Sequence, residues 1–267
     1  MRKPMVGTGW KMNHGAEQAR RYAAELRTAL EGADFDAQAL DLFVLPPFVA
    51  LPAAVEAFAG SAVAVGAQNM HWDAAGAWTG EVSAPMLREA GCRYVELAHS
   101  ERLWHFGETY AQVARKLDTA FGHGLVPILC LGETAEEKDG GRADEVLAWQ
   151  IRTALAGQDA SRAGAVVYAY EPRWAIGTAE AASPDYVAER HGRIRALIGR
   201  DWGAPAADAA RVIYGGSVNP DNGPALIALA DVDGLFIGRA AWTAAGFFTL
   251  VRIVAQARLT ARGAVAA

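Results

Sequence analysis

Short apolar runs recur along the chain, and amphipathic stretches separate them. The runs are mostly β-branched or leucine-rich, and each ends at Gly, Pro, Asn, His or Glu. Near-continuous apolarity over such lengths is typical of strands buried on both faces, as in a parallel sheet. The candidate strands are Met5–Gly9, Asp41–Leu45, Ala62–Ala67, Tyr94–Ala98, Val126–Leu131, Val166–Tyr170, Val212–Tyr214 and Gly234–Ile237.

Between these runs, the spacing of apolar residues predicts helices. The clearest are Ala16–Leu30, Thr109–Phe121, Ala143–Leu155 and Pro184–Ile198. Ser183–Pro184 predicts an N-cap followed by proline at the first helical position, and Asn219–Pro220 predicts the same. Eight strand–helix alternations favour an α/β fold, a single closed (β/α)8 barrel of eight parallel strands. We expect one catalytic domain over residues 1–267, since no long Ser/Pro/Gly linker interrupts the chain.

Composition narrows the function classes. The net charge is −5 with both signs interspersed, which argues against a nucleic-acid partner. Two cysteines, Cys92 and Cys130, lie in apolar contexts, so we expect no disulfide framework and a cytoplasmic location. We find no secretory signal, and the longest uncharged run, Ala240 to Val251, is too short for a membrane span.

The polar residues that follow the strands are the candidates for chemistry, because a barrel builds its site from the loops after its strands. Lys11 follows the first strand, and a lysine there can hold an anionic substrate and balance oxyanion charge. His99 follows the fourth, where a helix N-terminus would keep imidazole neutral. Glu171 follows the sixth and precedes an apolar, glycine-containing segment; we interpret it as a base under a closing lid, its pKa raised by burial. Each residue alone could instead be structural, and Glu101 and Arg102 could form a structural ion pair.

Glycine-rich loops follow the last two strands. Tyr214-Gly215-Gly216-Ser217 and Ile237-Gly238-Arg239 could bring backbone N–H groups close to a phosphate, as loops at these strands of a barrel commonly do. The histidines show no HExxH or paired metal-ligand spacing, and neither a Gly-x-Ser-x-Gly elbow nor a P-loop is present. We therefore expect neither a metal nor another cofactor.

Together these motifs resemble triosephosphate isomerase, a TIM barrel, from end to end. The matching segments, in the family's order, are Trp10-Lys11-Met12-Asn13, Gly66-Ala67-Gln68-Asn69, Thr79-Gly80-Glu81, Ala98-His99-Ser100-Glu101-Arg102, Cys130-Leu131-Gly132-Glu133, Tyr170-Glu171-Pro172, Trp174-Ala175-Ile176-Gly177-Thr178 and Tyr214-Gly215-Gly216-Ser217. The resemblance implies an isomerase of small phosphorylated sugars that works through an enediolate and uses no cofactor. The acid–base mechanism of this family is a general example of pKa tuning and loop closure.

The resemblance also implies residue roles. Glu171 would be the proton-shuttling base, His99 the neutral electrophile and Lys11 the substrate-holding cation. Backbone N–H groups of Gly177, Ser217, Gly238 and Arg239 would bind the phosphate. Pro172, Trp174 and Ile176 would belong to the lid, with Glu133 as a hinge partner of Trp174. The family is usually dimeric, so we expect a homodimer in which Thr79 reaches the neighbouring active site.

Five positions depart from the family pattern. Gly9 replaces an active-site asparagine, and Arg239 replaces a glycine beside the phosphate. Ala98 and Ala179 also replace glycines, and Arg173 lies in the lid's first hinge, where a small apolar residue is usual. The first-strand segment Gly7-Thr8-Gly9-Trp10-Lys11-Met12-Asn13 and the eighth-strand segment Asp233-Gly234-Leu235-Phe236-Ile237-Gly238-Arg239 are most similar to the branch that handles erythrulose phosphates in tetritol catabolism. The larger substrate of that branch requires a larger pocket, and Gly9 enlarges it near the reacting carbons. We expect L-erythrulose 1-phosphate and D-erythrulose 4-phosphate as substrates.

Three alternatives stay open at this point. The chain could be a triosephosphate isomerase in the strict sense, interconverting dihydroxyacetone phosphate and D-glyceraldehyde 3-phosphate. It could be a barrel lyase or aldolase that uses Lys11 as a Schiff base. It could also be a phosphosugar-binding barrel without activity.

Overall fold

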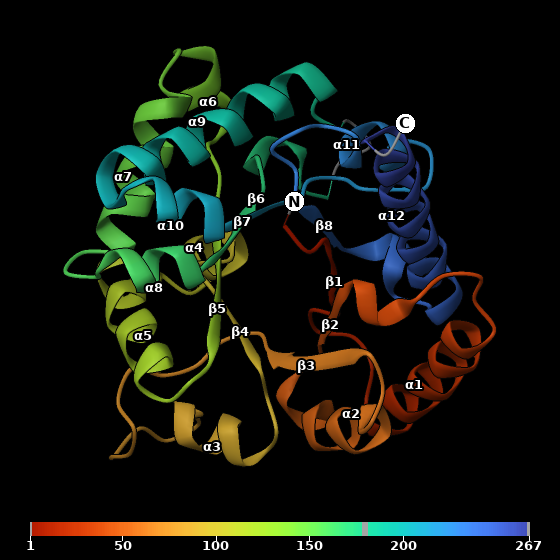
Figure 1. The fold of residues 1–267 in the computed structure, drawn as a ribbon. Helices are drawn as coiled ribbons and strands as arrows, with labels where there is room; N and C mark the ends of the chain where they lie inside the picture. The colour runs from red at the N-terminus through yellow and green to blue at the C-terminus, as the bar shows by residue number, and fades with distance from the viewer. Residues whose placement is uncertain (1, 178–180, 266–267) are drawn as a thin grey trace.

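The computed structural model describes residues 2–177 and 181–265 and shows a closed barrel of eight parallel strands in the order β1 to β8. Helices surround the barrel (Figure 1). The strands are β1 (Met5–Gly9), β2 (Asp41–Leu45), β3 (Val63–Ala67), β4 (Tyr94–Leu97), β5 (Val126–Leu131), β6 (Val167–Tyr170), β7 (Arg211–Tyr214) and β8 (Gly234–Ile237). The predicted fold is confirmed, and every predicted strand is present to within one residue at each end.

The helices alternate with the strands and lie outside them. They are α1 (Ala16–Glu31), α2 (Leu51–Phe58), α3 (Ala84–Glu89), α4 (Ser100–His105), α5 (Tyr110–Gly122), α6 (Ala135–Asp139), α7 (Ala143–Ala154), α8 (Ala160–Ala165), α9 (Pro184–Trp202), α10 (Ala204–Ala209), α11 (Gly223–Ile227) and α12 (Ala244–Val265). Short 3-10 turns are η1 (Ala37–Ala39), η2 (Phe48–Ala50), η3 (Arg173–Ala175) and η4 (Arg239–Ala241). In the part of the chain that the structure describes, none of these helices is long and apolar enough to cross a membrane.

The two predicted proline-marked helix starts have different outcomes. Ser183 caps α9 by accepting a hydrogen bond from the Tyr186 N–H, and Pro184 takes the first turn, as predicted. The second prediction is wrong, because α11 begins only at Gly223. The Asn219 side chain instead accepts the N–H groups of Asp221 and Asn222 at 2.9 and 3.1 Å. A side chain that satisfies these donors locally forms a turn rather than a helix start.

Two apolar cores stabilise the barrel. The larger lies between the strands and the helices, and the smaller fills the interior of the barrel. In the interior, the Phe43 ring contacts Tyr94 and Phe236, with centroid separations of 5.1 and 5.6 Å. A Cβ at Gly7 would lie 1.9 Å from Phe43 Cζ, so glycine is needed there. These rings fill the centre of the barrel, with the Asp41–Arg211 ion pair at the amino end of the strands and a second group of polar side chains toward the mouth.

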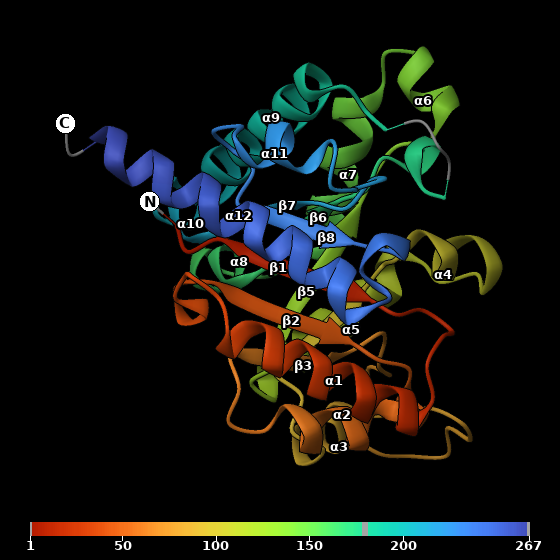
Figure 2. The ribbon, with the colours of Figure 1, turned by 90° about the vertical axis from the view of Figure 1, so that its right-hand side faces the viewer.

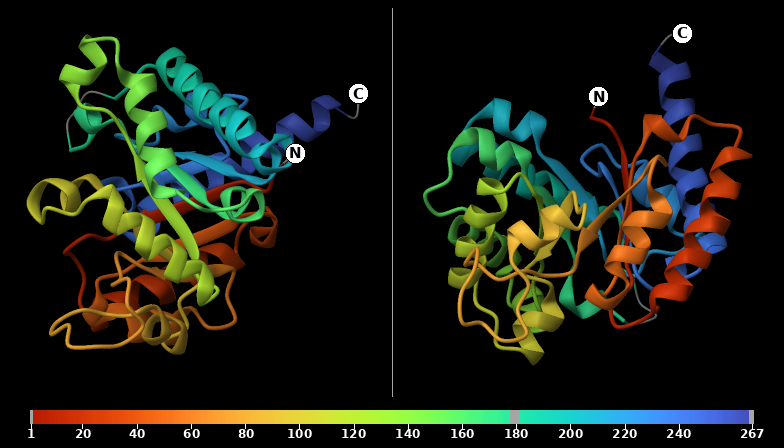
Figure 3. Two further views of the ribbon diagram at one scale, coloured as in Figure 1. Left: turned by 90° about the vertical axis from the view of Figure 1, so that its left-hand side faces the viewer. Right: turned by 90° about the horizontal axis from the view of Figure 1, so that it is seen from below.

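The carboxyl ends of all eight strands open on one side of the molecule. In Figure 2 the arrowheads of β2 and β8 point to the right, α4 lies at that end, and the end of α12 lies at the other. The segment between β3 and α3 also projects on the α4 side (Figure 3). Loops from distant parts of the chain therefore meet around one mouth, as the fold class requires.

Candidate active site

Glu171, which directly follows β6, is deeply buried at the mouth. Its main chain is tied to the neighbouring strand, since its N–H donates to the Leu131 carbonyl at 2.7 Å. Two glycines make room for it: a Cβ at Gly132 would lie 1.9 Å from the Glu171 carbonyl oxygen, and one at Gly215 would lie 2.6 Å from Oε1. A larger residue at Gly132 would displace the Glu171 main chain, and one at Gly215 would displace its carboxylate. Glu171 is 5% exposed, and its Oε2 has no hydrogen-bond partner among the described residues.

Burial raises the pKa of Glu171 well above its ordinary value, and the charge of Glu96 raises it further. Lys11 acts in the opposite direction. A carboxylate that is poorly solvated and lacks donors is a stronger base than one in water. The predicted direction of this shift is therefore borne out by the geometry around the side chain.

His99 faces Glu171 from the end of β4. Its Nε2 lies 3.5 Å from Glu171 Oε2, and its Nδ1 accepts the Glu101 N–H at 3.2 Å, which caps α4. Because Nδ1 accepts, the proton of the neutral ring lies on Nε2, directed into the mouth. Burial lowers the pKa of His99 to about 4, and the positive charges of Lys11 and Arg102 act in the same direction. The neutral imidazole expected from the sequence is thus supported, with burial as the leading cause.

Lys11 completes the group from the end of β1. Its Nζ donates to Glu101 Oε1 at 2.6 Å, and its backbone carbonyl accepts from Gln68 Nε2 at 3.0 Å. Although burial lowers the Lys11 pKa, the hydrogen bond and charge of Glu101 outweigh it and the net pKa is raised. Lys11 has a φ of 51°, a left-handed conformation that costs a non-glycine residue about 1–2 kcal/mol. The expected Glu101–Arg102 pair is wrong, because Glu101 pairs with Lys11 whereas Arg102 lies 3.5 Å from Glu108.

The structure adds a residue that the sequence predictions omitted, Glu96. It lies within β4 and faces the barrel interior, where it is 6% exposed. Burial raises the pKa of Glu96 to about 7. Glu96, His99 and Glu171 each present a ligand atom within 4.8 Å of the others, a donor set that could hold a metal ion. Glu171 lies far from the other two residues in the sequence, so no short motif joins all three. A carboxylate within an otherwise apolar strand could nevertheless have marked Glu96 as a candidate functional residue.

Glu133, the predicted hinge partner of Trp174, is fully buried after β5. Its carboxylate accepts hydrogen bonds from Trp174 Nε1 at 2.8 Å, from Tyr186 OH at 3.0 Å and from Tyr170 OH at 3.0 Å. The predicted pairing of Glu133 with Trp174 is therefore present. Pro172 is buried and precedes η3, while Ile176 is half-buried. Thr178 and Ala179 lie outside the described residues.

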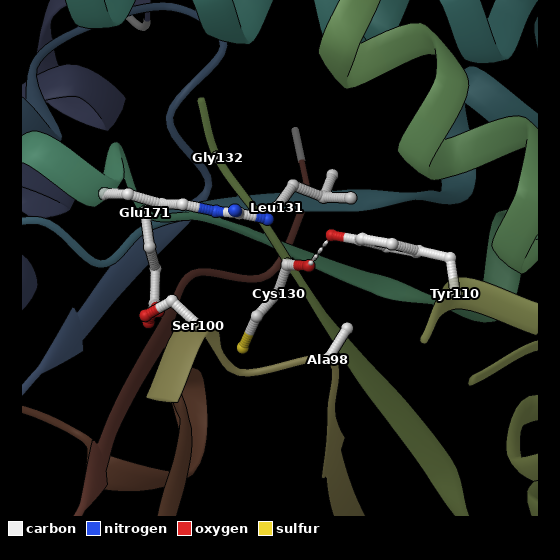
Figure 4. A pocket seen from close by; sticks show the side chains of 8 residues that line it. Ala98, Ser100, Tyr110, Cys130, Leu131, Gly132 and Glu171 are labelled. Carbon is white, nitrogen blue, oxygen red and sulfur yellow. Dashed lines mark hydrogen bonds between the residues drawn. The ribbon is translucent and has the colours of Figure 1, made fainter. Parts of the chain in front are cut away.

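A small cavity lies behind the Glu171 main chain, between the ends of β4, β5 and β6. Figure 4 shows that the Cys130 sulfur and the Glu171 carboxylate extend to the same side of β5, with Ser100 beside the carboxylate. Tyr110 OH donates to the Cys130 carbonyl at 3.3 Å, across the cavity (Figure 4). Arg173 also lines this cavity and lies 5.7 Å from the Trp104 ring. Arg173, which is unusual for the family at the predicted hinge position, thus packs beside α4 and α5.

The predicted phosphate loops lie at neighbouring strand ends. Ser217 follows β7 and its Oγ donates to the Ala175 carbonyl of the lid at 2.8 Å. Gly238 and the exposed Arg239 follow β8, beside β1. Gly177 has a φ of 71° and is exposed. These loops border the side of the mouth that carries Glu171 and Gly9.

The fold and this cluster define a barrel enzyme whose chemistry takes place at the carboxyl ends of its strands. Comparison with known proteins agrees: the family model described as triosephosphate isomerase matches residues 4–254. The chain is 44% identical over 252 residues to a triosephosphate isomerase of Herpetosiphon aurantiacus, covering 94% of this chain and 99% of the relative. It is 45% identical over 255 residues to an L-erythrulose-1-phosphate isomerase of Brucella abortus, covering 94% and 96%.

Solved structures place the chain in the same group. The structure of triosephosphate isomerase from Bartonella henselae superposes with a TM-score of 0.84 at 32% identity, over 94% of this chain and 99% of that one. This chain therefore belongs to the triosephosphate isomerase family, and it is an isomerase. Its relatives with different substrate names are similar to it to nearly the same degree, so overall identity does not choose between them.

Proposed function

We propose that this enzyme interconverts L-erythrulose 1-phosphate and D-erythrulose 4-phosphate through an enediolate. One observation carries the choice of substrate: position 9, at the mouth end of β1, has no side chain and opens toward the reacting cluster. A Cβ built at Gly9 would lie 3.5 Å from Phe236 Cζ and 3.9 Å from Glu96 Oε2. Compared with dihydroxyacetone phosphate, the tetrulose phosphate carries an extra hydroxymethyl on the carbon that loses its proton, and this space could receive it.

The proposed mechanism assigns one step to each residue. The Glu171 carboxylate removes the proton from C3 of L-erythrulose 1-phosphate, and the electrons of that bond form the C2–C3 enediolate. His99 donates its Nε2 hydrogen bond to the oxygen that gains charge, and Lys11 balances that charge. The hydroxyl proton on O3 then passes to O2, and Glu171 returns the carbon-bound proton to C2, which leaves the carbonyl on C3 and a hydroxyl group on C2. The 3.5 Å between His99 Nε2 and Glu171 Oε2 lets both act on adjacent atoms of one substrate.

The geometry disfavours the proposed alternatives. A Schiff-base lysine must lose its proton to attack a carbonyl, whereas the Glu101 contact raises the pKa of Lys11. Borohydride trapping with substrate should therefore yield no covalent adduct. A barrel that only binds phosphosugars would have no need for an unpaired buried carboxylate beside a neutral imidazole, an arrangement that costs stability.

The deciding experiment compares kcat/KM for L-erythrulose 1-phosphate and D-glyceraldehyde 3-phosphate. We expect the tetrulose phosphate to be preferred, and a preference of about a hundredfold or more for the triose would refute the proposed substrate; such a ratio corresponds to about 2.7 kcal/mol in transition-state binding. Gly9→Asn and Arg239→Gly should shift preference toward the triose. An added Cβ at Gly9 meets only ordinary contacts, so the asparagine variant should fold. Glu171→Asp and Glu171→Gln should abolish turnover of both substrates.

We also propose a homodimer. Large apolar side chains are exposed after β1 and on the β3–α3 segment: Met12 is 95% exposed, and Trp78, next to Thr79 in the chain, is 47% exposed. Thr79 itself is exposed on the projecting β3–α3 segment. Sedimentation of the wild type and of Trp78→Asp should show a dimer and a monomer, and a wild-type monomer would contradict the proposal. The cytoplasmic location, the absence of a cofactor and the phosphate-binding roles remain predictions.

A further inference from the structure

The carboxyl group of Glu96 takes no part in the proton transfers assigned above, yet it lies inside the reacting cluster. Side chains alternate along β4, so Tyr94 and Glu96 face the barrel interior while Val95 and Leu97 face the helices. Tyr94 belongs to the aromatic packing in the centre. Glu96 is the next inward residue toward the mouth and therefore lies above that packing, on the floor of the site.

Its surroundings do not explain a carboxyl group at this position. Among the described residues, its hydrogen-bond contact is the Cys130 thiol, whose Sγ lies 3.7 Å from Glu96 Oε1; a thiol is a weak donor. The charges of Lys11 and Arg102 lower the pKa of Glu96, that of Glu101 raises it, and the charge of Glu96 in turn raises the pKa of Glu171. A buried polar group with one weak partner costs stability, so a purely structural role would favour an apolar residue here.

Glu96 also borders the space that glycine leaves at position 9. A Cβ at Gly9 would point at Glu96 Oε2, 3.9 Å away, and at the edge of the Phe236 ring. The other side of the carboxyl group faces His99 and Glu171, whose ligand atoms lie within 4.8 Å. One oxygen therefore borders the open space, while the whole group lies next to the base.

We propose that Glu96 is a specificity-determining residue that hydrogen-bonds the additional hydroxymethyl group of a tetrulose phosphate, held in the space beside Gly9. This inference rests on the proposed function. The hydroxymethyl is bonded to the carbon whose proton Glu171 removes, so its hydroxyl must lie within a few ångströms of the Glu171 carboxylate. Glu96 has no assigned catalytic step and borders the space beside Gly9, whereas Ser100, which also has no assigned step, lines the cavity behind the Glu171 main chain. A triose phosphate lacks this hydroxymethyl and would leave Glu96 without that partner.

The test measures kcat/KM for both substrates in the wild type, Glu96→Gln and Glu96→Val. Glu96→Val removes the hydrogen bond and keeps an apolar strand residue, so we expect about a 10- to 150-fold loss for L-erythrulose 1-phosphate, as for a lost bond to a polar substrate group. Because loss of the Glu96 charge also changes the pKa of Glu171 and so affects both substrates, the contact is measured by the ratio of the two kcat/KM values, which should move about tenfold or more toward D-glyceraldehyde 3-phosphate. Glu96→Gln retains a hydrogen-bonding side chain of the same length and should recover most of the tetrulose activity.

The matched control is Tyr94→Phe, which removes a polar atom from the same interior face of β4 but lies one layer below the mouth. It should leave the ratio of the two kcat/KM values unchanged. Equal losses for both substrates in Glu96→Val, or no loss for either, would overturn the role of Glu96. The wild-type ratio tests the proposed function separately: a strong triose preference refutes the substrate, whereas the change of ratio on substitution tests the contact.

Discussion

We expect the free energy of unfolding of Glu96→Gln, measured relative to that of the wild type, to be higher at pH 8 than at pH 5. Burial raises the pKa of Glu96 from 4.5 to about 7. A carboxyl group whose pKa is raised by folding stabilises the folded state fully below its unfolded pKa, and this contribution is lost as the pH rises through the folded pKa. The wild type therefore loses stability between about pH 4.5 and pH 7, and glutamine, which does not titrate, removes that loss.

The magnitude follows from the size of the shift. A pKa rise from 4.5 to about 7 amounts to about 3 kcal/mol over the whole range, at about 1.4 kcal/mol per pKa unit. Because some of the loss has already occurred at pH 5, the change between pH 5 and pH 8 should be about 2–3 kcal/mol. Glu171 adds to it in the same direction, since the charge of Glu96 also raises its pKa.

Urea unfolding followed by tryptophan fluorescence at both pH values measures this difference. The cost of burying the glutamine amide is the same at both, so it cancels when the two values of ΔΔG are compared. Glu25→Gln, on the exposed face of α1, is the control and should show the same ΔΔG at pH 5 and pH 8. If Glu96→Gln also gave the same ΔΔG at both, the Glu96 carboxyl group would not be desolvated as the structure indicates.

Two further predictions concern the backbone and the hinge. Ala98 has a φ of 61° and is buried; Ala98→Gly should change stability by less than about 1 kcal/mol, because relief of strain offsets the added backbone entropy, whereas Ala98→Val should cost more than about 2 kcal/mol. Thermal unfolding of both variants checks this, and a well-tolerated valine would contradict it. Glu133→Ala should cost about 3–5 kcal/mol, because three donors lose their charged acceptor, while Tyr186→Phe should cost only about 1–2 kcal/mol. Equal urea midpoints for these two variants would argue against Glu133 as the centre of the hinge.

The fold could be predicted from the sequence because each strand is marked by a short segment of neighbouring residues. Each barrel strand is buried on both faces, so it is marked by a short apolar run, and the eight runs were found to within one residue. The end of β4 at Leu97 rather than Ala98 has a backbone cause, since Ala98 adopts a left-handed conformation that no strand continues through. Asn219–Pro220 was misread because an asparagine that caps a helix and one that closes a turn accept the same kind of N–H donor.

The candidate site could be predicted from the sequence only in part. Lys11, His99 and Glu171 were predicted because each stands at a strand end, where polarity is unexpected. Glu96 was missed because it lies within a strand that was treated as uniformly apolar, although the same argument from buried charge applied to it. The donors to Glu133 could not be predicted in full, because Tyr170 and Tyr186 approach it from other elements. Only the three-dimensional arrangement shows that one carboxylate serves all of them.

Glu96 and the departures at positions 9 and 239 are related through charge and space. Glu96 brings a second carboxyl group beside Glu171, in a mouth that must also accept a phosphate and stabilise an enediolate. Each added negative charge there weakens substrate binding, more so in a buried site than in water. Arg239, exposed at the end of β8 next to β1, adds a positive charge on the side of the mouth where we predict that the phosphate binds. If the proposed tetrulose phosphate is the substrate, a glycine that opens the space, a carboxyl group that binds the added hydroxyl and a guanidinium that offsets the carboxyl charge are together what it would require.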